Sequence, residues 1–303
     1  MVTVLMSTYN GQSYLSEQLD SILNQTYDEV NLLVRDDGST DNTIQILKTY
    51  ANINISRMKW YQGDNLGCGK SFFQLVLDAP ISDYYAFSDQ DDFWENDKLQ
   101  KAIDVISQYP QDIPALYCSK ANPVNENLEQ YQYREIPMDI TPSFGNALTM
   151  DIAPGCTFVF NKKLLIEFRK MDINDIDIHD WSLYRVVTAM GGIVYYDKTS
   201  YIKYRQHSKN VIGYQSTVIQ HWKGRIKRFK NKEYRTIRHQ MAKNIKKVYY
   251  DKMPEENKIM LDTFVNYKKS FKAKIKLLHM KEFKMAKKSD NIILKILIIL
   301  GLI

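Results

Sequence analysis

The strongest constraint on the fold comes from the first 120 residues, where short apolar runs alternate with helical segments. The apolar runs are residues 2–7, 30–35, 58–61 and 84–88. Between the first two runs, Leu15, Leu19 and Ile22 recur with the spacing of one helix face. Apolar runs this short are typical of buried strands, and parallel strands need crossover helices between them. The sequence therefore predicts an α/β fold with a mostly parallel central sheet.

Less regular elements follow this α/β pattern. Further strands are predicted at residues 115–119, 156–160, 193–196 and 201–204, and helices at residues 162–170 and 181–190. Residues 122–150 show little periodicity and are expected to form loops. After Gly213 the sequence changes to long Lys-rich helical stretches. We therefore expect two domains, residues 1–213 and a basic helical extension of residues 214–303.

The charges divide the chain in the same way. Residues 216–303 contain 23 of the 41 Lys and Arg residues but only 7 of the 35 Asp and Glu residues, a net charge of +16. The residues before them carry a net charge of −10. The chain thus combines an acidic body, large enough to bury a sizeable core, with a basic C-terminal segment.

The cysteines and the N-terminus indicate the compartment. Cys68, Cys118 and Cys156 lie far apart, with no CxxC pair and no even-numbered framework. This pattern predicts neither a disulfide scaffold nor a zinc ribbon, and a reducing compartment fits it best. The apolar run at residues 2–6 lacks a basic region before it and is too short for a signal peptide, so we expect a cytoplasmic protein.

Clusters of carboxylates follow two of the predicted strands. Residues 36–39 read Asp-Asp-Gly-Ser, and residues 89–92 read Asp-Gln-Asp-Asp. Open α/β sheets bind ligands beyond the carboxyl ends of their strands, and neighbouring carboxylates repel one another unless a cation or hydrogen-bond donors neutralise them. Hard oxygen ligands suit Mg²⁺ or Mn²⁺ that takes its other ligands from phosphates. The structural alternatives are a helix-capping turn at residues 36–41 and a solvated acidic turn at residues 89–92.

Two motifs near the end of the acidic body carry further candidates. Asp180 lies in His-Asp-Trp at residues 179–181, where it is either a helix cap or a general base. His207 lies in Arg-Gln-His at residues 205–207, after the last predicted strand, and is either structural or a ligand. Neither motif alone decides between the two interpretations.

Seven short motifs in a fixed order resemble those of glycosyltransferase family 2, the inverting enzymes with the GT-A nucleotide-sugar fold. They are Ser-Thr-Tyr-Asn (7–10), Asp-Asp-Gly-Ser (36–39), Asn-Leu-Gly (65–67), Asp-Gln-Asp-Asp (89–92), Gly-Cys-Thr (155–157), His-Asp-Trp (179–181) and Tyr-Arg-Gln-His (204–207). Their joint occurrence over residues 2–213 is more specific than any single motif. Within the family, the Ser-Asp-Gln-Asp-Asp-x-Trp, His-Asp-Trp and Tyr-Arg-Gln-His-x-x-Asn-Val motifs resemble those of bacterial rhamnosyltransferases of surface-polysaccharide assembly.

The resemblance implies a role for each candidate residue. The nucleotide-sugar group would be Thr8, Tyr9, Asp37, Asn65, Lys70 and Asp89, in which Asp37 accepts the N3–H of a pyrimidine base and Asp89 faces the ribose. Asp91, Asp92 and His207 would hold Mg²⁺ or Mn²⁺ at the diphosphate, and Asp180 would be the catalytic base. Gly155, Cys156, Thr157 and Trp181 would lie on the acceptor side, with the loops of residues 122–150. Lys70 lies closer to Asn65 than the corresponding basic residue of the family usually does.

The implied reaction is the transfer of a sugar from a dTDP- or UDP-linked donor, with dTDP-rhamnose expected first, to a hydroxyl of a growing, lipid-linked cell-surface glycan. A sugar-phosphate nucleotidyltransferase would share a related sheet, but it is expected to carry a Gly-rich basic loop after the first strand, where this chain reads Ser-Thr-Tyr-Asn-Gly-Gln. A nucleic-acid-binding module is the other alternative, and the acidic body argues against it.

The C-terminal segment is expected to lie on an anionic membrane at the inner face of the cell membrane. Its last twelve residues, 292–303, are apolar except for Lys295 and Gly301, and as a helix they would extend only about 18 Å against a hydrocarbon core of roughly 30 Å. Upstream, lysines between residues 268 and 288 alternate with Phe271, Ile275, Leu278, Phe283 and Met285, which suits an amphipathic helix at the headgroups. The alternative is a helical tail that packs on the body or on a second subunit, as in a homo-oligomer.

Overall fold

The computed structural model describes residues 1–130, 141–207 and 232–303, with side chains described from residue 236 onward in the last range. The chain packs as two compact units. The first, named the α/β unit, comprises residues 1–131, 153–183 and 193–211, and the second, named the helical unit, comprises residues 132–152, 184–192 and 212–303. The domain boundary predicted at residue 213 lies outside the described residues and stays a prediction.

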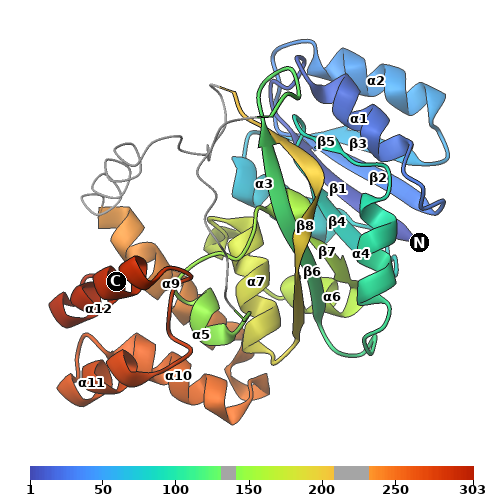
Figure 1. Ribbon diagram of the computed structural model, residues 1–303. Coiled ribbons are helices and arrows are strands. Elements are labelled where there is room, and N and C mark those ends of the chain that lie inside the picture. The colour runs from blue at the N-terminus through green and yellow to red at the C-terminus, as the bar shows by residue number, and fades with distance from the viewer. Residues whose placement is uncertain (131–140, 208–231) are drawn as a thin grey trace. The chain divides into compact units, whose positions relative to one another are not determined.

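Strands and helices alternate along the α/β unit (Figure 1). Its strands are β1 (Val2–Thr8), β2 (Val30–Asp36), β3 (Met58–Gln62), β4 (Tyr84–Ser88), β5 (Phe93–Trp94), β6 (Ala115–Val124), β7 (Val159–Asn161) and β8 (Ile193–Arg205). Its helices are α1 (Leu15–Leu23), α2 (Thr43–Ile53), α3 (Cys68–Asp78), α4 (Lys98–Ile106), α6 (Lys162–Phe168) and the first residues of α7 (His179–Ala189), with the 3₁₀ turns η1 (Gly155–Thr157) and η2 (Ile173–Asp175).

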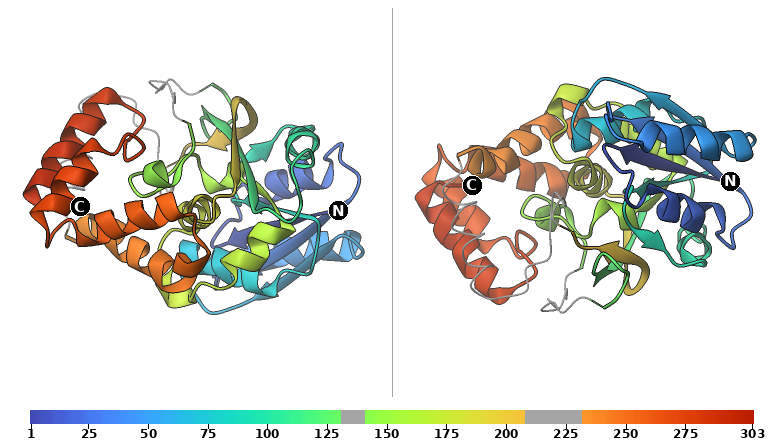
Figure 2. Two further views of the ribbon diagram at one scale, coloured as in Figure 1. Left: turned by 90° about the horizontal axis from the view of Figure 1, so that it is seen from below. Right: turned by 90° about the horizontal axis from the view of Figure 1, so that it is seen from above.

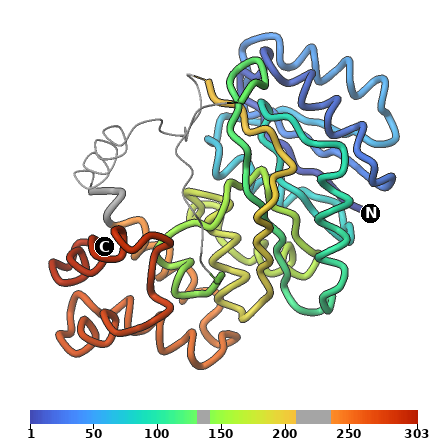
Figure 3. Tube along the Cα trace, viewed as in Figure 1, coloured from blue at the N-terminus to red at the C-terminus, as the bar shows by residue number. Residues whose placement is uncertain are grey.

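The strands form one eight-stranded sheet in the order β3-β2-β1-β4-β7-β6-β8-β5. Strand β1 is parallel to β2 and β4, β2 is parallel to β3, and β6 is parallel to β8, which lies beside it in Figure 3. Strand β7 is antiparallel to both β4 and β6, and β5 is antiparallel to β8. Because β4 and β6 are both antiparallel to β7, the strands β1, β2, β4, β6 and β8 all point the same way. Their carboxyl ends therefore meet at one edge of the sheet.

Helices cover both faces of this sheet, and successive residues of β4 show it, since neighbouring side chains of a strand point to opposite faces. Phe87 packs against Phe72 of α3, with ring centroids 5.4 Å apart. The next residue, Ser88, accepts a hydrogen bond from the side chain of Gln18 in α1 at 2.8 Å. In Figure 2, α1 and α4 lie on one side of the sheet, and α3 and α6 lie on the other. The predicted α/β fold with a mostly parallel sheet is confirmed.

Some element boundaries differ from the predictions. Residues 193–196 and 201–204, predicted as two strands, form the single strand β8, because the chain continues along β6 through an irregular register. The strand predicted at residues 156–160 begins only at Val159, since Gly155–Thr157 turns as η1. The region 122–150, predicted to form loops, contains the end of β6 and the short helix α5 (Phe144–Ala147). The sequence analysis misses β5, which is two residues long, and α4.

The helical unit confirms the predicted helical C-terminal extension. Its elements are α5, the part of α7 from Tyr184, α9 (Lys232–Tyr249), η3 (Tyr250–Lys252), α10 (Glu255–Asn266), α11 (Phe271–His279) and α12 (Lys288–Leu300). The amphipathic segment expected around residues 268–288 is interrupted, because α11 ends at His279. In addition, Phe283 is only 6% exposed and is buried within the unit. No helix in the described parts of the chain combines the length and the apolarity needed to cross a membrane.

Candidate active site

The turns that carry the predicted motifs lie at the carboxyl edge of the sheet. Thr8 and Asp36 end β1 and β2 and are paired in register, while Ser88 ends the neighbouring β4. Strand β8 points in the same direction and ends at Arg205, directly before the segment that contains His207. The Asp-Asp-Gly-Ser, Asp-Gln-Asp-Asp and Tyr-Arg-Gln-His motifs are therefore brought to one edge, where open α/β sheets bind their ligands.

Gln90 joins the turn after β1 to the turn after β4. Its side-chain oxygen accepts a hydrogen bond from the Tyr9 N–H at 2.9 Å, and its side-chain nitrogen donates to the Tyr9 carbonyl at 3.0 Å. Gly11 leaves room for this contact, because a Cβ at that position would lie 2.2 Å from Oε1 of Gln90. The Tyr9 side chain remains 49% exposed and free to contact a ligand. Sequence analysis gives Gln90 no role, because its partner lies 81 residues away.

Asp36 is structural. Its carboxylate accepts hydrogen bonds from the Thr8 hydroxyl at 3.0 Å and the Gly38 N–H at 3.1 Å. Gly38 has a φ of 84°, which a side chain would disfavour. Asp41 accepts a hydrogen bond from the Thr43 N–H at 3.0 Å, at the start of α2. The N-cap residue of α2, Asn42, makes no capping side-chain hydrogen bond, so Asp36 and Asp41 stabilise the turn itself. The Thr8 side chain, 1% exposed, lies beneath this turn.

Asp37 organises the Asn-Leu-Gly loop at residues 65–67. Its carboxylate accepts hydrogen bonds from the Leu66 and Gly67 N–H groups, both at 2.9 Å, and forms a buried ion pair with Arg35. Asp37 is only 3% exposed, so these contacts satisfy most of a carboxylate that is largely removed from water. A base bound here would donate its N–H to the lone pairs of the Asp37 carboxylate that these contacts do not use.

Cys68, the first residue of α3, lies where the acidic side chains converge. The pKa of its thiol is raised, first by desolvation and then by four carboxylates, which belong to Asp89, Asp180, Asp37 and Asp91. These four carboxylates come from three segments of the α/β unit, since Asp89 and Asp91 share the turn after β4. Asn65 is exposed on the loop before Cys68. Lys70 is the only basic residue of α3 and is half-buried in the first turn of that helix. The predicted nucleotide and catalytic residues thus surround one helix N-terminus.

Asp91 and Asp92 have different surroundings. Oδ2 of Asp91 lies 2.9 Å from Nε2 of His207, and their side chains are 18% and 8% exposed. Asp92 is fully buried, and its Oδ1 accepts a hydrogen bond from the Arg205 N–H at 3.1 Å. Burial, followed by the charges of Asp91 and Asp89, raises the pKa of Asp92. The predicted metal group therefore consists of a mostly buried pair, Asp91 and His207, and a carboxylate that is fully enclosed.

Asp92 belongs to a buried polar cluster. Ligand atoms of Asp89, Asp92 and Cys156 lie within 4.8 Å of one another. Lys98 is 2% exposed and holds its ammonium 3.5 Å from the centre of the Trp94 ring. Burial lowers the pKa of Lys98 to about 7, while the negative charges of Cys156 and Asp92 oppose this shift. Cys156, predicted on the acceptor side, is thus enclosed in the core with 1% exposure, and sequence analysis misses Lys98.

Arg205 holds the Asp91 turn in place, a role that its motif alone did not predict. Its Nε donates to the Asp91 carbonyl at 2.8 Å, and its guanidinium pairs with the carboxylate of Glu17 in α1. The same guanidinium lies 4.4 Å from the centre of the Tyr14 ring. Tyr14 also stacks on His207, with ring centroids 5.2 Å apart. A single buried cation therefore positions both Asp91 and its partner His207.

The carboxylate of Asp180 joins the start of α7 to η1. Its Oδ2 accepts a hydrogen bond from the Gly155 N–H at 2.9 Å, and its Oδ1 accepts one from the Trp181 N–H at 2.7 Å. A helix cap would accept from an amide two or three residues onward, and neither of these contacts is of that kind. Asp180 lies in the first turn of α7, and its role as a general base stays a prediction. Gly155 permits the approach, because a Cβ there would lie 2.9 Å from Cβ of Asp180. Trp181 and Thr157 are 5% and 0% exposed and support the site from within.

The donor set fits a hard divalent cation. The pKa of Asp89 is also raised, first by burial and then by the neighbouring charges of Asp91 and Asp180. A bound cation would relieve this repulsion. A carboxylate such as that of Asp91 is a ligand that Mg²⁺ or Mn²⁺ prefers, and the imidazole of His207 would be an additional, softer ligand.

Comparison with known proteins identifies the family of the chain. The family model described as Glycosyl transferase family 2 matches residues 3–169. The chain is 35% identical over 246 residues to the dTDP-rhamnosyl transferase RfbG of Shigella flexneri, covering 76% of this chain and 81% of the relative. It is 24% identical to the uncharacterized glycosyltransferase RT0329 of Rickettsia typhi, covering 81% of this chain and 78% of the relative.

Solved structures show the same fold. The S. aureus TarS 1–349 structure superposes with a TM-score of 0.60 at 18% identity, covering 92% of this chain and 75% of that one. The complex of TarS 1–349 with UDP-GlcNAc gives a TM-score of 0.61 at 18% identity, covering 93% of this chain and 78% of that one. These matches confirm the predicted GT-A fold.

The buried position of Arg205 gives a stability prediction. Arg205→Met removes the hydrogen bond to the Asp91 carbonyl and the ion pair with Glu17, so we expect the free energy of unfolding to fall by about 1.5–3 kcal/mol, the usual contribution of hydrogen bonds that involve a charged group. Lys203→Met is the matched control, because Lys203 lies on the same strand and pairs with Glu95 at 3.7 Å near the surface, where such pairs contribute about 0–1 kcal/mol. Urea unfolding of both variants measures the difference, and equal losses would contradict the positioning role.

Proposed function

The chain belongs to glycosyl transferase family 2, and from this premise we propose that it transfers a sugar from a nucleotide-diphosphate donor to a hydroxyl of a growing glycan. The observation that carries the proposal is the geometry at the carboxyl edge of the sheet, where Asp37 holds the loop before α3, Asp180 accepts a hydrogen bond from Gly155, and Asp89 lies close to Cys156. A donor with a base, a ribose and a diphosphate needs contacts of different kinds along its length. These carboxylates, together with His207, supply them.

The nucleotide is proposed to lie along the turns after β1, β2 and β4. Tyr9 offers an exposed ring for the base, and Asp37 faces its N3–H. Asp89 faces the ribose, with Asn65 on the loop before α3, Lys70 in the first turn of α3 and Thr8 beneath the turn after β1. The aromatic and carboxylate contacts suit a pyrimidine, since an imide N–H is a donor that a carboxylate can accept.

The diphosphate is proposed to bind with Mg²⁺ or Mn²⁺ at Asp91 and His207, with Asp92 and Asp89 contributing negative charge. Bound there, the cation would stabilise the charge that develops on the leaving diphosphate. Arg205 fixes the carbonyl of Asp91 and stacks on Tyr14, which in turn packs on His207. The protein thus holds both proposed ligands in place before a cation arrives.

Asp180 is proposed to be the general base. Its carboxylate is partly exposed and fixed by the Gly155 and Trp181 N–H groups, and each oxygen keeps acceptor capacity for an acceptor hydroxyl. Asp180 would take the hydroxyl proton as the acceptor oxygen forms its bond to the anomeric carbon and the bond from that carbon to the diphosphate breaks. A single displacement of this kind inverts the anomeric centre.

The donor is proposed to be dTDP-rhamnose. The support is the 35% identity to a protein named dTDP-rhamnosyl transferase. The acceptor is proposed to be a lipid-linked cell-surface glycan, which would be presented to a cytoplasmic enzyme at the inner face of the membrane. The basic helical unit is proposed to bind that anionic surface, with a second subunit as the alternative partner.

A screen of nucleotides tests the donor assignment. We expect dTDP and UDP, each with Mg²⁺ or Mn²⁺, to raise the melting temperature of the protein more than GDP does, because a ligand that binds only the folded state stabilises it and Asp37 matches a pyrimidine imide. Thermal shift at equal nucleotide concentrations measures the order. Stronger stabilisation by GDP would contradict the assignment.

Asp91→Ala tests the metal assignment. We expect this variant to lose the cation-dependent part of dTDP binding, because the diphosphate charge is then left without a proposed ligand for its counterion. Calorimetric titration with and without Mn²⁺ measures this part. Asp28→Ala, at an exposed carboxylate outside the site, is the control and should bind like the parent protein. Unchanged Mn²⁺-dependent affinity in Asp91→Ala would overturn the assignment.

Asp180→Asn separates binding from chemistry. The amide oxygen can still accept one of the two backbone hydrogen bonds, so donor affinity should be retained while transfer falls by a factor of roughly 10²–10⁴, the usual contribution of a general base. The control is Asp177→Asn, an exposed residue on the preceding loop. Single-turnover transfer from dTDP-rhamnose to an acceptor glycan provides the measurement. Transfer at the parental rate in Asp180→Asn would place the base elsewhere.

Membrane binding is tested with full-length protein and vesicles. We expect the protein to sediment with phosphatidylglycerol-containing vesicles more than with pure phosphatidylcholine, and less so at high salt, because lysines near an anionic surface each contribute about 1 kcal/mol and salt screens them. Absence of sedimentation with either vesicle, or equal sedimentation with both, would contradict the proposed electrostatic association.

A further inference from the structure

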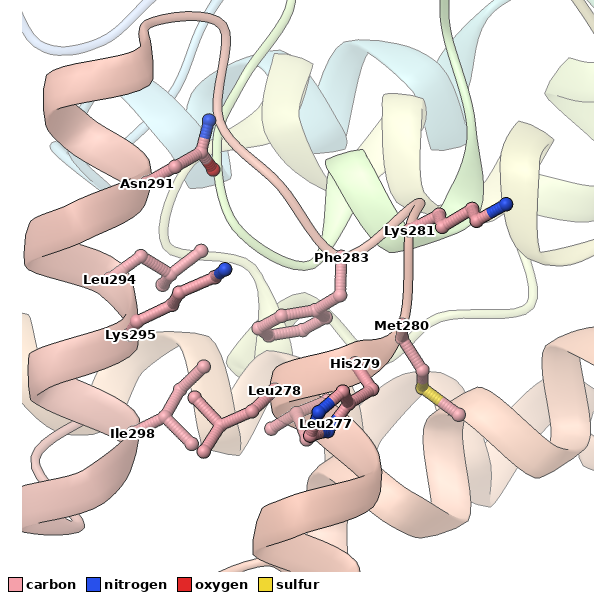
Figure 4. Close-up of a pocket in the computed structure, with 10 residues that line it drawn as sticks. All are labelled: Leu277, Leu278, His279, Met280, Lys281, Phe283, Asn291, Leu294, Lys295 and Ile298. Carbon is pink, nitrogen blue, oxygen red and sulfur yellow. The ribbon is translucent and has the colours of Figure 1, made fainter.

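Helix α12 carries two apolar faces, and among the described residues of the helical unit only one of these faces is buried. Leu294 and Ile298, four residues apart, are 4% and 1% exposed. Figure 4 shows both directed toward the end of α11, where they line a cavity of about 290 Å³ together with Leu278 and Phe283. This face therefore supplies the packing that holds α12 in the unit.

The other face of α12 is exposed although it is equally apolar. Ile292, Ile296 and Ile299 recur at the spacing of one helix face and are 63%, 50% and 56% exposed. None of them lines the cavity. A continuous stripe of large aliphatic side chains in water is costly for a soluble surface and usually marks an interaction site.

Positive charge borders this stripe. Lys288 and Lys295, seven residues apart and both exposed, lie on one flank of it by helical spacing. From α11, the ammonium of Lys274 donates to the Ile299 carbonyl at 2.9 Å, which brings a further lysine to the same helix. Residues 268–303 contain ten lysines and only two acidic residues. The surroundings of the stripe are therefore strongly basic.

We propose that the outer face of α12, formed by Ile292, Ile296 and Ile299, inserts into the headgroup region of an anionic membrane while the flanking lysines bind lipid phosphates. The proposal rests on the proposed membrane association of the helical unit and assigns it to one helix face. Charge complementarity selects the occupant, since an apolar stripe bordered by lysines suits an anionic lipid surface. With 13 residues, α12 is about 20 Å long, which fits a helix that lies in the interface and does not span it.

The face differs from the one expected from sequence alone. The sequence pattern pointed to Phe271, Ile275, Leu278, Phe283 and Met285 as the membrane face. Phe283 is 6% exposed, so it cannot enter a bilayer without leaving the core of the unit. Phe271 and Ile275, 78% and 43% exposed on α11, remain available beside α12 as secondary contacts.

The test compares two triple variants of the full-length protein. Ile292→Gln/Ile296→Gln/Ile299→Gln removes the proposed face. Ile53→Gln/Ile55→Gln/Ile81→Gln is the matched control, because these isoleucines are similarly exposed, at 75%, 78% and 57%, but belong to the α/β unit. Partition onto vesicles of phosphatidylglycerol and phosphatidylcholine is measured by sedimentation. Thermal unfolding and Mn²⁺-dependent dTDP binding are measured on the same samples to verify that each variant is folded.

We expect the α12 variant to partition onto anionic vesicles at least tenfold more weakly than the parent protein, because interfacial binding scales with buried apolar area, and the control to stay within about twofold. Equal partition of the parent protein and the α12 variant would overturn the face while leaving membrane association intact. Absence of partition by the parent protein would overturn both the assigned face and the proposed membrane association. If that protein still transferred sugar to a soluble acceptor, the enzymatic proposal would stand. The oligomeric state is measured by light scattering. If the α12 substitutions convert a dimer to a monomer and leave the partition onto vesicles unchanged, the face binds a second copy and the proposal is overturned.

Discussion

The repulsion between carboxylates that the sheet brings to its carboxyl edge governs the arrangement of the α/β unit. Asp89, Asp91 and Asp92 follow one strand, and Asp37 and Asp180 come from other loops. Like charges this close would drive the loops apart or protonate the acids unless the surroundings compensate them. Buried cations and backbone N–H groups provide part of this compensation, and the remaining charge is proposed to attract the cation that binds the diphosphate.

Different buried cations and backbone N–H groups compensate different carboxylates. Arg35 neutralises Asp37, and the N–H groups of the following loop hold it, so this carboxylate is fixed in an enclosed position. Lys98 lies in the core near Asp92, and Arg205 fixes the main chain at Asp91. None of these cations needs to move for a ligand to bind. The most accessible acidic groups are therefore the ones proposed to meet the cation and the acceptor.

The sequence predicts the parallel half of the sheet well, because β1 to β4 are short apolar runs and the first three of them each lead into a helix. It predicts Asp91 and His207 through their positions after strands, and both residues follow strands that end at the carboxyl edge of the sheet, while their roles stay predictions. It does not reveal Gln90, Lys98 or the role of Arg205, because their partners are distant in sequence and a buried Lys or Arg looks like a surface residue in a linear pattern. The enclosure of Thr8 and Cys156 is invisible for the same reason, and helical periodicity alone cannot tell which apolar face of α12 is packed.

The most direct test of the central claim is the energetic coupling between cation and nucleotide in the parent protein. If uncompensated carboxylates and a diphosphate share one cation, Mn²⁺ should bind at least tenfold more tightly when dTDP is present, and by reciprocity dTDP should bind more tightly by the same factor when Mn²⁺ is present. Calorimetric titration of Mn²⁺ at zero and saturating dTDP, corrected for Mn²⁺ binding to free dTDP, measures this factor. Identical Mn²⁺ affinity in the two titrations would contradict the account.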